Sequence, residues 1–532
     1  MRSKKQSKTE GFATKLEFNA EFNQAMELLE KSDKNVFITG RAGTGKSTLL
    51  SYFRLKTKKK VVVLAPTGVA AINVSGQTIH SFFGFKPNIT LAKVRKEHQE
   101  DDKSNIFKKI EVIVIDEISM VRADLLDCVD KFLRLNGKDK NKSFGGVQMI
   151  FIGDLYQLSP VVTGKERDFF RTFYDSPYFF SAKVFSQKDF EMELLELEKI
   201  YRQKDDEFIH LLNVIRNRTV EEKDLKILNK RLDFDFVAEE SDYYIYLTTT
   251  NDLADKVNVE KLTNLPGEIR SFRASISGNF SREYYPTSEI LELKEEAQVM
   301  LLNNDPHGRW VNGTIARIVG FEKETSFDQS ITVRLENGKI EKISPHTWKI
   351  FRFSLEKSKL VSHSAGDFTQ YPLRLAFAIT IHKSQGKTFD KTIIDIGSGT
   401  FAHGQMYVAL SRCRTLEGIV LKKEIKKQHI LMDWRVIKFI TDFQYKKAEK
   451  NFSLAEKIEL ITKAIKENSD LNMLYLKGKD EKSRRKIKPK NIAQTEFMGY
   501  SFLGLTCHCY ASGQEKIFNV ARILEIGESK DE

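Results

Sequence analysis

The sequence predicts an α/β fold with two parallel-sheet domains, a small β insert and a C-terminal domain that is mainly β. Short β-branched runs bounded by Gly, Pro or Asp recur across the first 190 residues, with helical stretches between them. The same pattern returns between residues 244 and 396, and a stretch of alternating apolar and polar residues with Gly breaks interrupts it. Continuous apolar runs are typical of strands buried in a parallel sheet, whereas alternation is typical of antiparallel strands with one wet face.

The first domain is expected over residues 1–190. A helix is expected from Phe18 onward, because apolar residues recur at helical spacing up to Leu29. Four buried strands are expected after it, at Asn35–Thr39, Val61–Ala65, Val112–Ile115 and Gln148–Ile152.

The second domain is expected in two parts, residues 191–304 and 371–450, because the β insert of residues 305–370 separates them. Its strands are expected at Tyr244–Thr249, Ala376–Ile381 and Thr392–Ile396. The C-terminal domain, residues 453–532, is expected to begin with a helix over Leu454–Asn468 and to continue as short strands.

The composition excludes several classes of protein. The 532 residues are too many for one core and suggest about three or four domains. No run of 18 apolar residues is present, so no membrane partner is expected. Four cysteines give no disulfide framework, and a reducing cytoplasm is the expected location. The formal net charge of +13 is compatible with a polyanionic partner without identifying it.

The segment Gly40–Ser47 reads GRAGTGKS, which follows an apolar strand and precedes a helix. Its glycines let backbone N–H groups surround phosphate oxygens at the amino end of that helix. Lys46 is predicted to reach the β- and γ-phosphates, and Ser47 to bind Mg²⁺. The phosphate-binding residues are predicted to be Gly43, Thr44, Gly45, Lys46, Ser47 and Thr48. ATP and Mg²⁺ are therefore the expected cofactors.

Two acids and a glutamine complete a hydrolytic site. VIVI runs straight into Asp116 and Glu117, at the strand end where an open α/β sheet binds ligands. Asp116 is predicted to hold Mg²⁺, and Glu117 to orient or deprotonate the attacking water. Gln157, in IGDLYQLSP after the next strand, is placed to sense the γ-phosphate or that water.

Further motifs resemble the PIF-family, RecD-like branch of the superfamily 1B DNA helicases. They occur in the family's order over residues of roughly 20 to 435, and they read LAPTGVAAINVSGQTIHSFFGF, VIVIDEISMVRADLLDCVD, FGGVQMIFIGDLYQLSPV, LEKIYRQ, LTTTNDLADKVN, AFAITIHKSQGKTFD and GQMYVALSRCRTLEGI. The resemblance implies two RecA-like domains and an SH3-like β insert.

The resemblance also implies an activity. A member would be an ATP-dependent DNA helicase that translocates 5′ to 3′ on single-stranded DNA and unwinds duplex or structured DNA in replication, recombination and repair. Its partners would be single-stranded DNA and junctions of single- and double-stranded DNA, and its active form a monomer. Arg202 and Arg412 would be arginine fingers from the second domain, and Gly386 would bring backbone close to the same phosphate.

The family's DNA strand lies across both α/β domains. The resemblance assigns phosphate contacts to Pro66, Thr67, Thr78, His80, His382 and Ser384. Read singly, such hydroxyl groups are often helix caps or buried hydrogen bonds, so this alternative stays open. A small wedge insertion is expected over about 82–108. Its Phe82, Phe83 and Phe85 are either a stacking surface or, more commonly, core aromatics.

One position departs from the family pattern. The helix ahead of the phosphate loop usually carries a Gln that reads adenine, but Phe22 stands there, and Gln24 is out of phase. Nucleotide selectivity is therefore open, with ATP as the expected substrate.

Residues 453–526 resemble a WYL domain, although its namesake triplet reads Ser501-Phe502-Leu503 here. Residues 477–490 carry eight Lys or Arg and two acids, which favours a phosphate backbone over a merely solvated hairpin. The resemblance points to a basic groove formed by Tyr475, Arg484, Arg485 and Arg522. The sequence Cys507-His508-Cys509 is read as strand alternation, not as a zinc site.

Three other functions stay open. The first is a DNA-stimulated ATPase or translocase that remodels protein–DNA complexes. The second is a WYL-type sensor of single strands or ligands with an auxiliary motor. The third is a RecD-like subunit of a nuclease complex. The intact hydrolytic residues argue against the second function, and the PIF-like signature argues against the third.

Overall fold

The computed structural model describes residues 20–86, 88–96, 106–239, 242–325, 328–356, 359–397, 399–497 and 499–528. These residues form two compact units. The larger unit extends to Leu431, apart from Asn217–Thr219. Those three residues group with the smaller unit, which begins at Met432.

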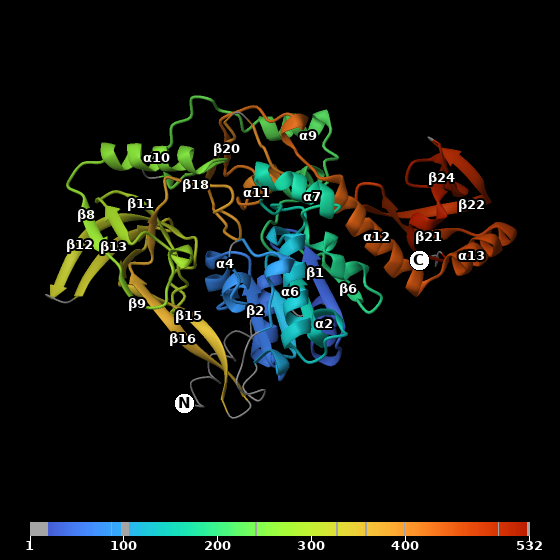
Figure 1. Ribbon diagram of the computed structural model, residues 1–532. Helices are drawn as coiled ribbons and strands as arrows, with labels where there is room; N and C mark the ends of the chain where they lie inside the picture. Colours follow the sequence, from blue (N-terminus) through green and yellow to red (C-terminus); the bar gives the residue numbers. More distant parts are fainter. Residues whose placement is uncertain are drawn as a thin grey trace. The chain divides into compact units, whose positions relative to one another are not determined.

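A six-stranded parallel sheet forms the centre of the first domain, in the order β3-β2-β4-β5-β1-β6 (Figure 1). Its strands are β1 (Asn35–Gly40), β2 (Val61–Ala65), β3 (Gln77–Thr78), β4 (Val112–Ile115), β5 (Gln148–Ile152) and β6 (Met192–Leu197). Its helices are α2 (Ala20–Lys31), α3 (Lys46–Lys56), α4 (Gly68–Asn73), α5 (Ile79–Phe82), α6 (Ala123–Asn136) and α7 (Arg167–Phe173). The four predicted strands are confirmed, whereas β3 and β6 were not predicted.

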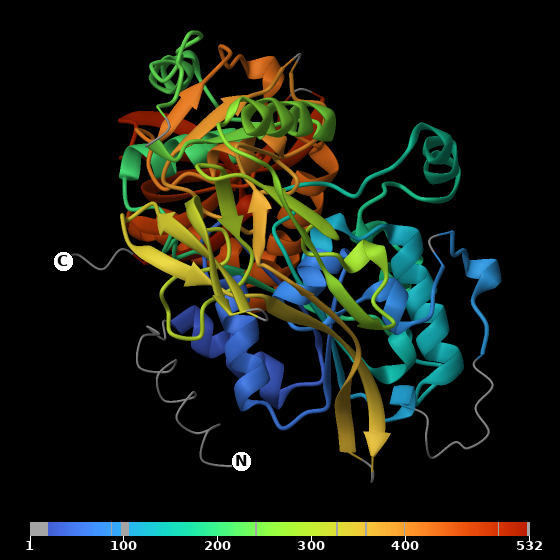
Figure 2. The same ribbon diagram turned by 90° about the vertical axis from the view of Figure 1, so that its left-hand side faces the viewer.

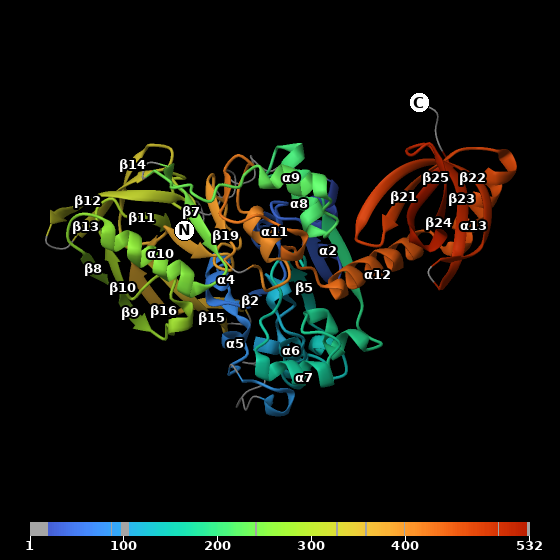
Figure 3. The same cartoon turned by 90° about the horizontal axis from the view of Figure 1, so that it is seen from above.

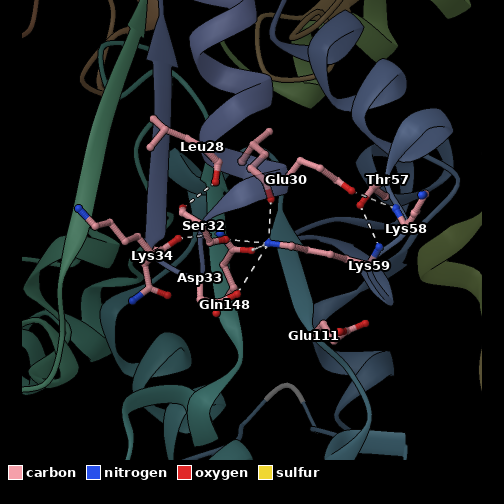
Figure 4. A network of polar contacts seen from close by, with 12 residues as sticks. Leu28, Glu30, Ser32, Asp33, Lys34, Thr57, Lys58, Lys59, Glu111 and Gln148 are labelled. Atoms are coloured by element: carbon pink, nitrogen blue, oxygen red, sulfur yellow. Dashed lines mark hydrogen bonds and ion pairs between the residues drawn. The ribbon is translucent and has the colours of Figure 1, made fainter.

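A polar network fixes helix α2 to this sheet (Figure 4). Lys59 Nζ donates to the carbonyl oxygens of Leu29 and Ser32, at 3.0 and 2.7 Å, and to Oε1 of Gln148 at 2.9 Å. Gln148 Nε2 donates in turn to the Lys34 carbonyl at 2.8 Å. These bonds satisfy carbonyls at the end of α2, which no longer have helical partners.

The second α/β domain has a four-stranded parallel sheet in the order β18-β7-β19-β20. Its strands are β7 (Ile245–Thr248), β18 (Ala378–Thr380), β19 (Thr392–Asp395) and β20 (Ile419–Leu421). Its helices are α8 (Asp206–Arg216), α9 (Glu222–Asn229), α10 (Asn251–Asn264) and α11 (Gln405–Leu410). All three predicted strands of this domain are confirmed within one or two residues at each end.

The β insert is larger than the predicted residues 305–370. It comprises a two-stranded sheet (β10-β8), a five-stranded sheet (β14-β13-β12-β11-β17) and a three-stranded sheet (β15-β16-β9). The strands are β8 (Arg270–Arg273), β9 (Ser275–Gly278), β10 (Ile290–Leu293), β11 (Gln298–Leu301), β12 (Ile315–Thr325), β13 (Asp328–Leu335), β14 (Ile340–Ile343), β15 (His346–Glu356), β16 (Lys359–Gln370) and β17 (Leu373–Leu375). Figure 2 shows the long β15–β16 hairpin in gold. The predicted limits of the insert were too narrow, because β8–β11 and β17 in the flanking sequence also pair with its strands or with one another.

The smaller unit contains a five-stranded antiparallel sheet, in the order β24-β23-β22-β21-β25. Its elements are α12 (Trp434–Asn451), α13 (Leu454–Glu467), β21 (Leu471–Lys477), β22 (Glu481–Phe497), β23 (Tyr500–Cys509), β24 (Gln514–Asn519) and β25 (Ile523–Glu528). Helix α13 lies against the sheet (Figure 3) and buries Ile461 and Ala464 in its core. The predicted mainly-β domain is thus present, and its likeness to a WYL domain stays a prediction.

The boundary before the smaller unit lies earlier than the predicted residue 453, because α12 belongs to this unit. Gln444 Nε2 on α12 donates to Oδ1 of Asp480 at 2.8 Å, and α12 packs along β25. Within the described ranges, no helix is both long and apolar enough to cross a membrane.

We predict that Lys59→Ala lowers the free energy of unfolding by about 1–3 kcal/mol, because it leaves the Leu29 and Ser32 carbonyls without their partner. Urea unfolding measures this loss, and hydrogen–deuterium exchange locates it at the end of α2. The matched control is Lys58→Ala, whose side chain is exposed and whose bond to Glu30 uses the backbone N–H. Equal effects of the two substitutions would contradict the assigned role of Lys59.

Candidate active site

The phosphate loop connects β1 to the first turn of α3. Gly43 and Gly45 have φ angles of +83° and +88°, which L-residues with side chains rarely adopt. A Cβ atom on Gly43 would also lie 2.5 Å from Cβ of Arg202. The loop therefore depends on glycine both for its conformation and for the close approach of Arg202. Lys46 begins α3, and its Nζ donates to the carbonyls of Gly40 and Arg41 at 2.7 and 3.0 Å.

Two carboxyl groups follow β4 in a poorly solvated position. Burial, together with the charge of Glu117, raises the pKa of Asp116 to about 7. Burial also raises the pKa of Glu117, whose backbone has a φ of +50°. Gln385 Nε2, from the second domain, donates to Oε2 of Glu117 at 2.9 Å. Both carboxylates are thus destabilised as anions, a state that a nearby cation would relieve.

Two arginines reach the same place, Arg412 from the second domain and Arg202 from the segment after β6. The predicted origin of Arg202 in the second domain needs correction, because the N–H of its neighbour Tyr201 donates to the Gly43 carbonyl of the phosphate loop at 2.9 Å. Arg412 is 1% exposed and donates to the carbonyls of Val408 and Lys387, at 2.9 and 3.1 Å. Burial, and secondarily the charge of Arg202, lowers the pKa of Arg412 to about 9. Arg202 Nη1 donates to the Ser411 carbonyl at 3.1 Å, and burial lowers its pKa as well.

One cavity of about 700 Å³ brings these groups together. It contains all six predicted catalytic residues (Lys46, Asp116, Glu117, Gln157, Arg202 and Arg412) and all predicted phosphate-binding positions (Gly43, Thr44, Gly45, Ser47, Thr48 and Gly386). Residues that sequence reasoning did not select also line it, namely Ala42, Gly153, Tyr201, Val311, Asn312, Thr388 and Arg414. Tyr201 precedes Arg202, and Arg414 lies two residues after Arg412, so both are within the quoted motifs, and this position could have selected them.

The two α/β domains meet directly around the cavity. The phosphate-loop N–H of Ala42 donates to Oη of Tyr407 at 3.0 Å. His403 Nε2 lies 2.7 Å from the Leu155 carbonyl, within hydrogen-bonding distance. A Cβ on Gly404 would lie 2.3 Å from the Gln157 carbonyl oxygen, so only glycine permits this approach. The hydrolytic residues of one domain therefore touch the other domain through backbone atoms.

Phe22 lies in the same cavity, on α2. Its ring is 7% exposed and packs 6.0 Å from the ring of Tyr52. Gln24 is exposed to solvent on the same helix. The residue that stands in place of the family's Gln therefore lines the same cavity as the phosphate loop.

The predicted DNA contacts divide into open and buried groups. Pro66, His80 and His382 are half-buried, and Thr67 is exposed. Thr67 Oγ1 also caps α4 by accepting from the Ala70 N–H at 3.3 Å. Burial lowers the pKa of His382, whose ring lies 6.4 Å from that of the exposed Phe401.

Two of these predicted contacts need correction. Ser384 is fully buried, and its Oγ donates to the Ile381 carbonyl at 2.7 Å. Thr78 is 5% exposed, caps α5 and shares a 2.5 Å hydrogen bond with Tyr284 Oη. Both hydroxyl groups are occupied inside the protein, so neither is open to a DNA phosphate. Ser384 and Thr78 therefore follow the alternative interpretation, in which such hydroxyl groups cap helices or form buried hydrogen bonds.

The expected wedge is mainly a packed aromatic cluster where it is described. Phe83 and Phe85 are buried, and their rings pack against Phe107 and Phe132. The core alternative is confirmed for these two rings. Residues 97–105 of the predicted insertion lie outside the described residues.

The predicted C-terminal groove is divided by strand geometry. Arg484 and Arg485 are consecutive on β22 and so point to opposite faces. Arg485 is half-buried and contacts the Phe518 ring and Sγ of Cys509, whereas the Arg484 side chain is 82% exposed. Tyr475 packs on Phe518 as well, and Arg522 is exposed in the turn before β25.

Cys507 and Cys509 are both fully buried in the same core, as alternating strand positions predict. Over the described ranges, no cluster of three or more His, Cys, Asp or Glu side chains could hold a metal ion.

Known proteins share this architecture. A family model described as PIF1-like helicase matches residues 17–226. The ATP-dependent DNA helicase Pif1 of Bdellovibrio bacteriovorus is 33% identical over 81% of this chain and 93% of that protein. The chain belongs to the PIF1-like helicase family. The predicted resemblance is thereby confirmed.

Other members extend the comparison. The chain spans 58% of the ATP-dependent DNA helicase PIF1 of Homo sapiens, at 36% identity over 73% of this chain. Unliganded Pif1 from Bacteroides is 40% identical with a TM-score of 0.72, covering 82% of this chain and 97% of that one. Bacteroides Pif1 bound to single-stranded DNA gives 40% identity and a TM-score of 0.57, over 80% and 96%.

We predict that Asp116→Asn stabilises the protein without nucleotide or Mg²⁺. Because the folded-state pKa of Asp116 is raised to about 7, its contribution to stability is present at low pH and is lost as pH rises through 7. The variant should gain on the order of 2 kcal/mol over the wild type at pH 8, and less at pH 5. Urea unfolding in EDTA at both pH values measures this.

The matched control is Asp168→Asn, since the Asp168 side chain is 90% exposed. A gain for Asp116→Asn that does not change between pH 5 and pH 8 would contradict the electrostatic explanation.

Proposed function

We propose that this protein is an ATP-dependent DNA helicase that translocates 5′ to 3′ along single-stranded DNA and unwinds duplex DNA. One observation carries the proposal: the hydrolytic cavity is built from both α/β domains. Any change at the γ-phosphate of a bound nucleotide would therefore act on the distance between the domains. This is the requirement for converting hydrolysis into movement.

The first domain supplies phosphate and metal binding. The N–H groups of the phosphate loop and the amino end of α3 would bind the phosphates, with Lys46 beside them. Ser47 and Asp116 fit a magnesium ion, because both line the cavity and a cation beside Asp116 would offset the burial that raises its pKa. When bound, Mg²⁺ would neutralise charge on the phosphate oxygens.

Glu117 and Gln157 supply the attack on the phosphate. The raised pKa of Glu117 makes it a better proton acceptor than an ordinary carboxylate. Gln385 holds one oxygen of Glu117 from the second domain. The general base is therefore oriented only when the two domains are in contact.

Arg202 and Arg412 supply positive charge to the transition state. Backbone carbonyls hold both guanidinium groups in place, so they are oriented before a nucleotide arrives. Arg202 already lies beside the phosphate loop, whereas closure of the domains would bring Arg412 to the γ-phosphate and loss of that phosphate would release it. Alternate closing and opening moves the DNA-contacting surfaces past each other.

The DNA strand is proposed to cross both domains over Pro66, Thr67, His80 and His382. These groups contact phosphate without reading base sequence, which suits a translocating motor. The positive net charge favours such a partner. The binding of junctions, the monomeric active form and the cytoplasmic location are part of the proposal.

The test compares the ATPase rate with and without single-stranded DNA, and the unwinding of duplexes with only a 5′ or only a 3′ tail. We expect DNA to stimulate hydrolysis, and unwinding only from the 5′ tail. Lys46→Ala should lower hydrolysis by about 100-fold or more, because a phosphate-binding charge is lost. An ATPase rate that DNA does not change, or unwinding from the 3′ tail, would contradict the proposal.

A separate prediction concerns the nucleotide base. The Phe22 ring has no hydrogen-bonding group and can stack on any base, so kcat/KM for GTP, CTP and UTP should lie within about tenfold of ATP. Phe22→Gln should shift this ratio toward ATP, and Phe22→Leu should not. A wild-type preference for ATP of about 1,000-fold would show that other groups read the base.

A further inference from the structure

Arg216 is a buried charge that the proposed mechanism leaves unused. It is the last residue of α8 and is 3% exposed. Removing a guanidinium from water costs several kcal/mol unless good geometry compensates it. A buried arginine at this position is therefore expected to have a role other than packing.

Its surroundings fix the guanidinium plane closely. Cζ lies 3.7 Å from the centre of the Tyr156 ring, and Nη2 lies 3.7 Å from Oδ1 of Asp154. A planar guanidinium can lie flat on an aromatic ring while its N–H groups point toward a carboxylate, and a lysine ammonium does not reproduce this planar geometry. Asp154 is itself 1% exposed, so the attraction is little screened by water.

Asp154 links this arginine to the hydrolytic glutamine. Its Oδ2 accepts from Nε2 of Gln157 at 3.3 Å, and its Oδ1 accepts from the backbone N–H of Tyr156 at 3.1 Å. Because Asp154 accepts from the side-chain N–H of Gln157, it selects the amide orientation that leaves the side-chain oxygen Oε1 of Gln157 for other partners. Gln157 lines the nucleotide cavity.

The pair joins two domains. Asp154 follows β5 of the first domain, whereas α8 packs against α11 of the second. At the start of the segment that leads into α8, Gln203 Nε2 donates to the carbonyls of Ser411 and Cys413, at 3.3 and 3.1 Å. Movement of the second domain would therefore carry Arg216 toward or away from Asp154.

We infer that Arg216 is a positioning residue for hydrolysis: through Asp154 it orients Gln157 when the domains are closed. This inference rests on the proposed function. It adds a connection between the second domain and the hydrolytic site that acts on Gln157, beside the contact of Gln385 with Glu117 and the two arginine fingers.

The test is steady-state ATPase kinetics of the full chain with saturating single-stranded DNA. Arg216→Lys should lower kcat about tenfold or more and change KM for ATP less than about twofold, because a misplaced glutamine affects the transition state and not substrate binding. Asp154→Asn keeps the shape of the side chain, removes its charge and should show the same split. The thermal midpoint of each variant is recorded alongside.

Arg231→Lys is the matched control. This second-domain arginine donates to the carbonyls of Ile419 and Glu417 and does not line the nucleotide cavity. The kcat of the Arg231→Lys variant should therefore equal that of the wild type. If Arg216→Lys keeps the wild-type kcat, or lowers only the thermal midpoint, the inference is overturned. Should that variant not fold, an unchanged kcat in Asp154→Asn overturns it equally. A wild type without hydrolysis would instead overturn the proposed function, and the inference with it.

Discussion

The burial of charge between the two α/β domains is the constraint on which the rest of the structure depends. Asp116 and Glu117 face the cavity from one side, and Arg412 faces it from the other. Burial raises the pKa of both carboxyls and lowers that of the arginine, so each charge is held at a cost. A nucleotide with its metal would compensate both kinds of charge together, which makes ligand binding and domain closure favour each other.

This coupling needs close contact between the domains, and the backbone provides it. Gly404 approaches the Gln157 carbonyl at a distance that no side chain would allow, and Tyr407 accepts from the N–H of Ala42 in the phosphate loop. Gln385 reaches Glu117 in the same interface. Packed contacts of this kind have few intermediate arrangements, so a small change at the phosphate becomes a displacement of the whole domain.

Many of the strands and of the cavity residues could be predicted from the sequence. Strands β2, β4 and β5 were predicted at their observed limits, because fully buried parallel strands read as uninterrupted apolar runs. Strand β6 was not predicted because MELLEL mixes Glu with Leu, as a half-buried strand at the edge of a sheet permits. The catalytic and phosphate-binding residues of the cavity were predictable because they lie in short motifs, several of which directly follow strands. Gln385 and Arg216 were not, because their importance arises only when the domains meet.

The direction of side chains explains the other failures. Ser384 lies within a helicase motif, yet a turn directs its hydroxyl into the protein, and no local pattern reports that. The opposite directions of Arg484 and Arg485, in contrast, could have been predicted, because consecutive residues of a strand such as β22 point to opposite faces of the sheet. Since Arg485 is half-buried against Phe518 and Cys509, the basic stretch presents less charge to a partner than its composition implies. The affinity of the C-terminal unit for a polyanion should therefore be reckoned from the basic residues on its exposed face and not from the total in the sequence.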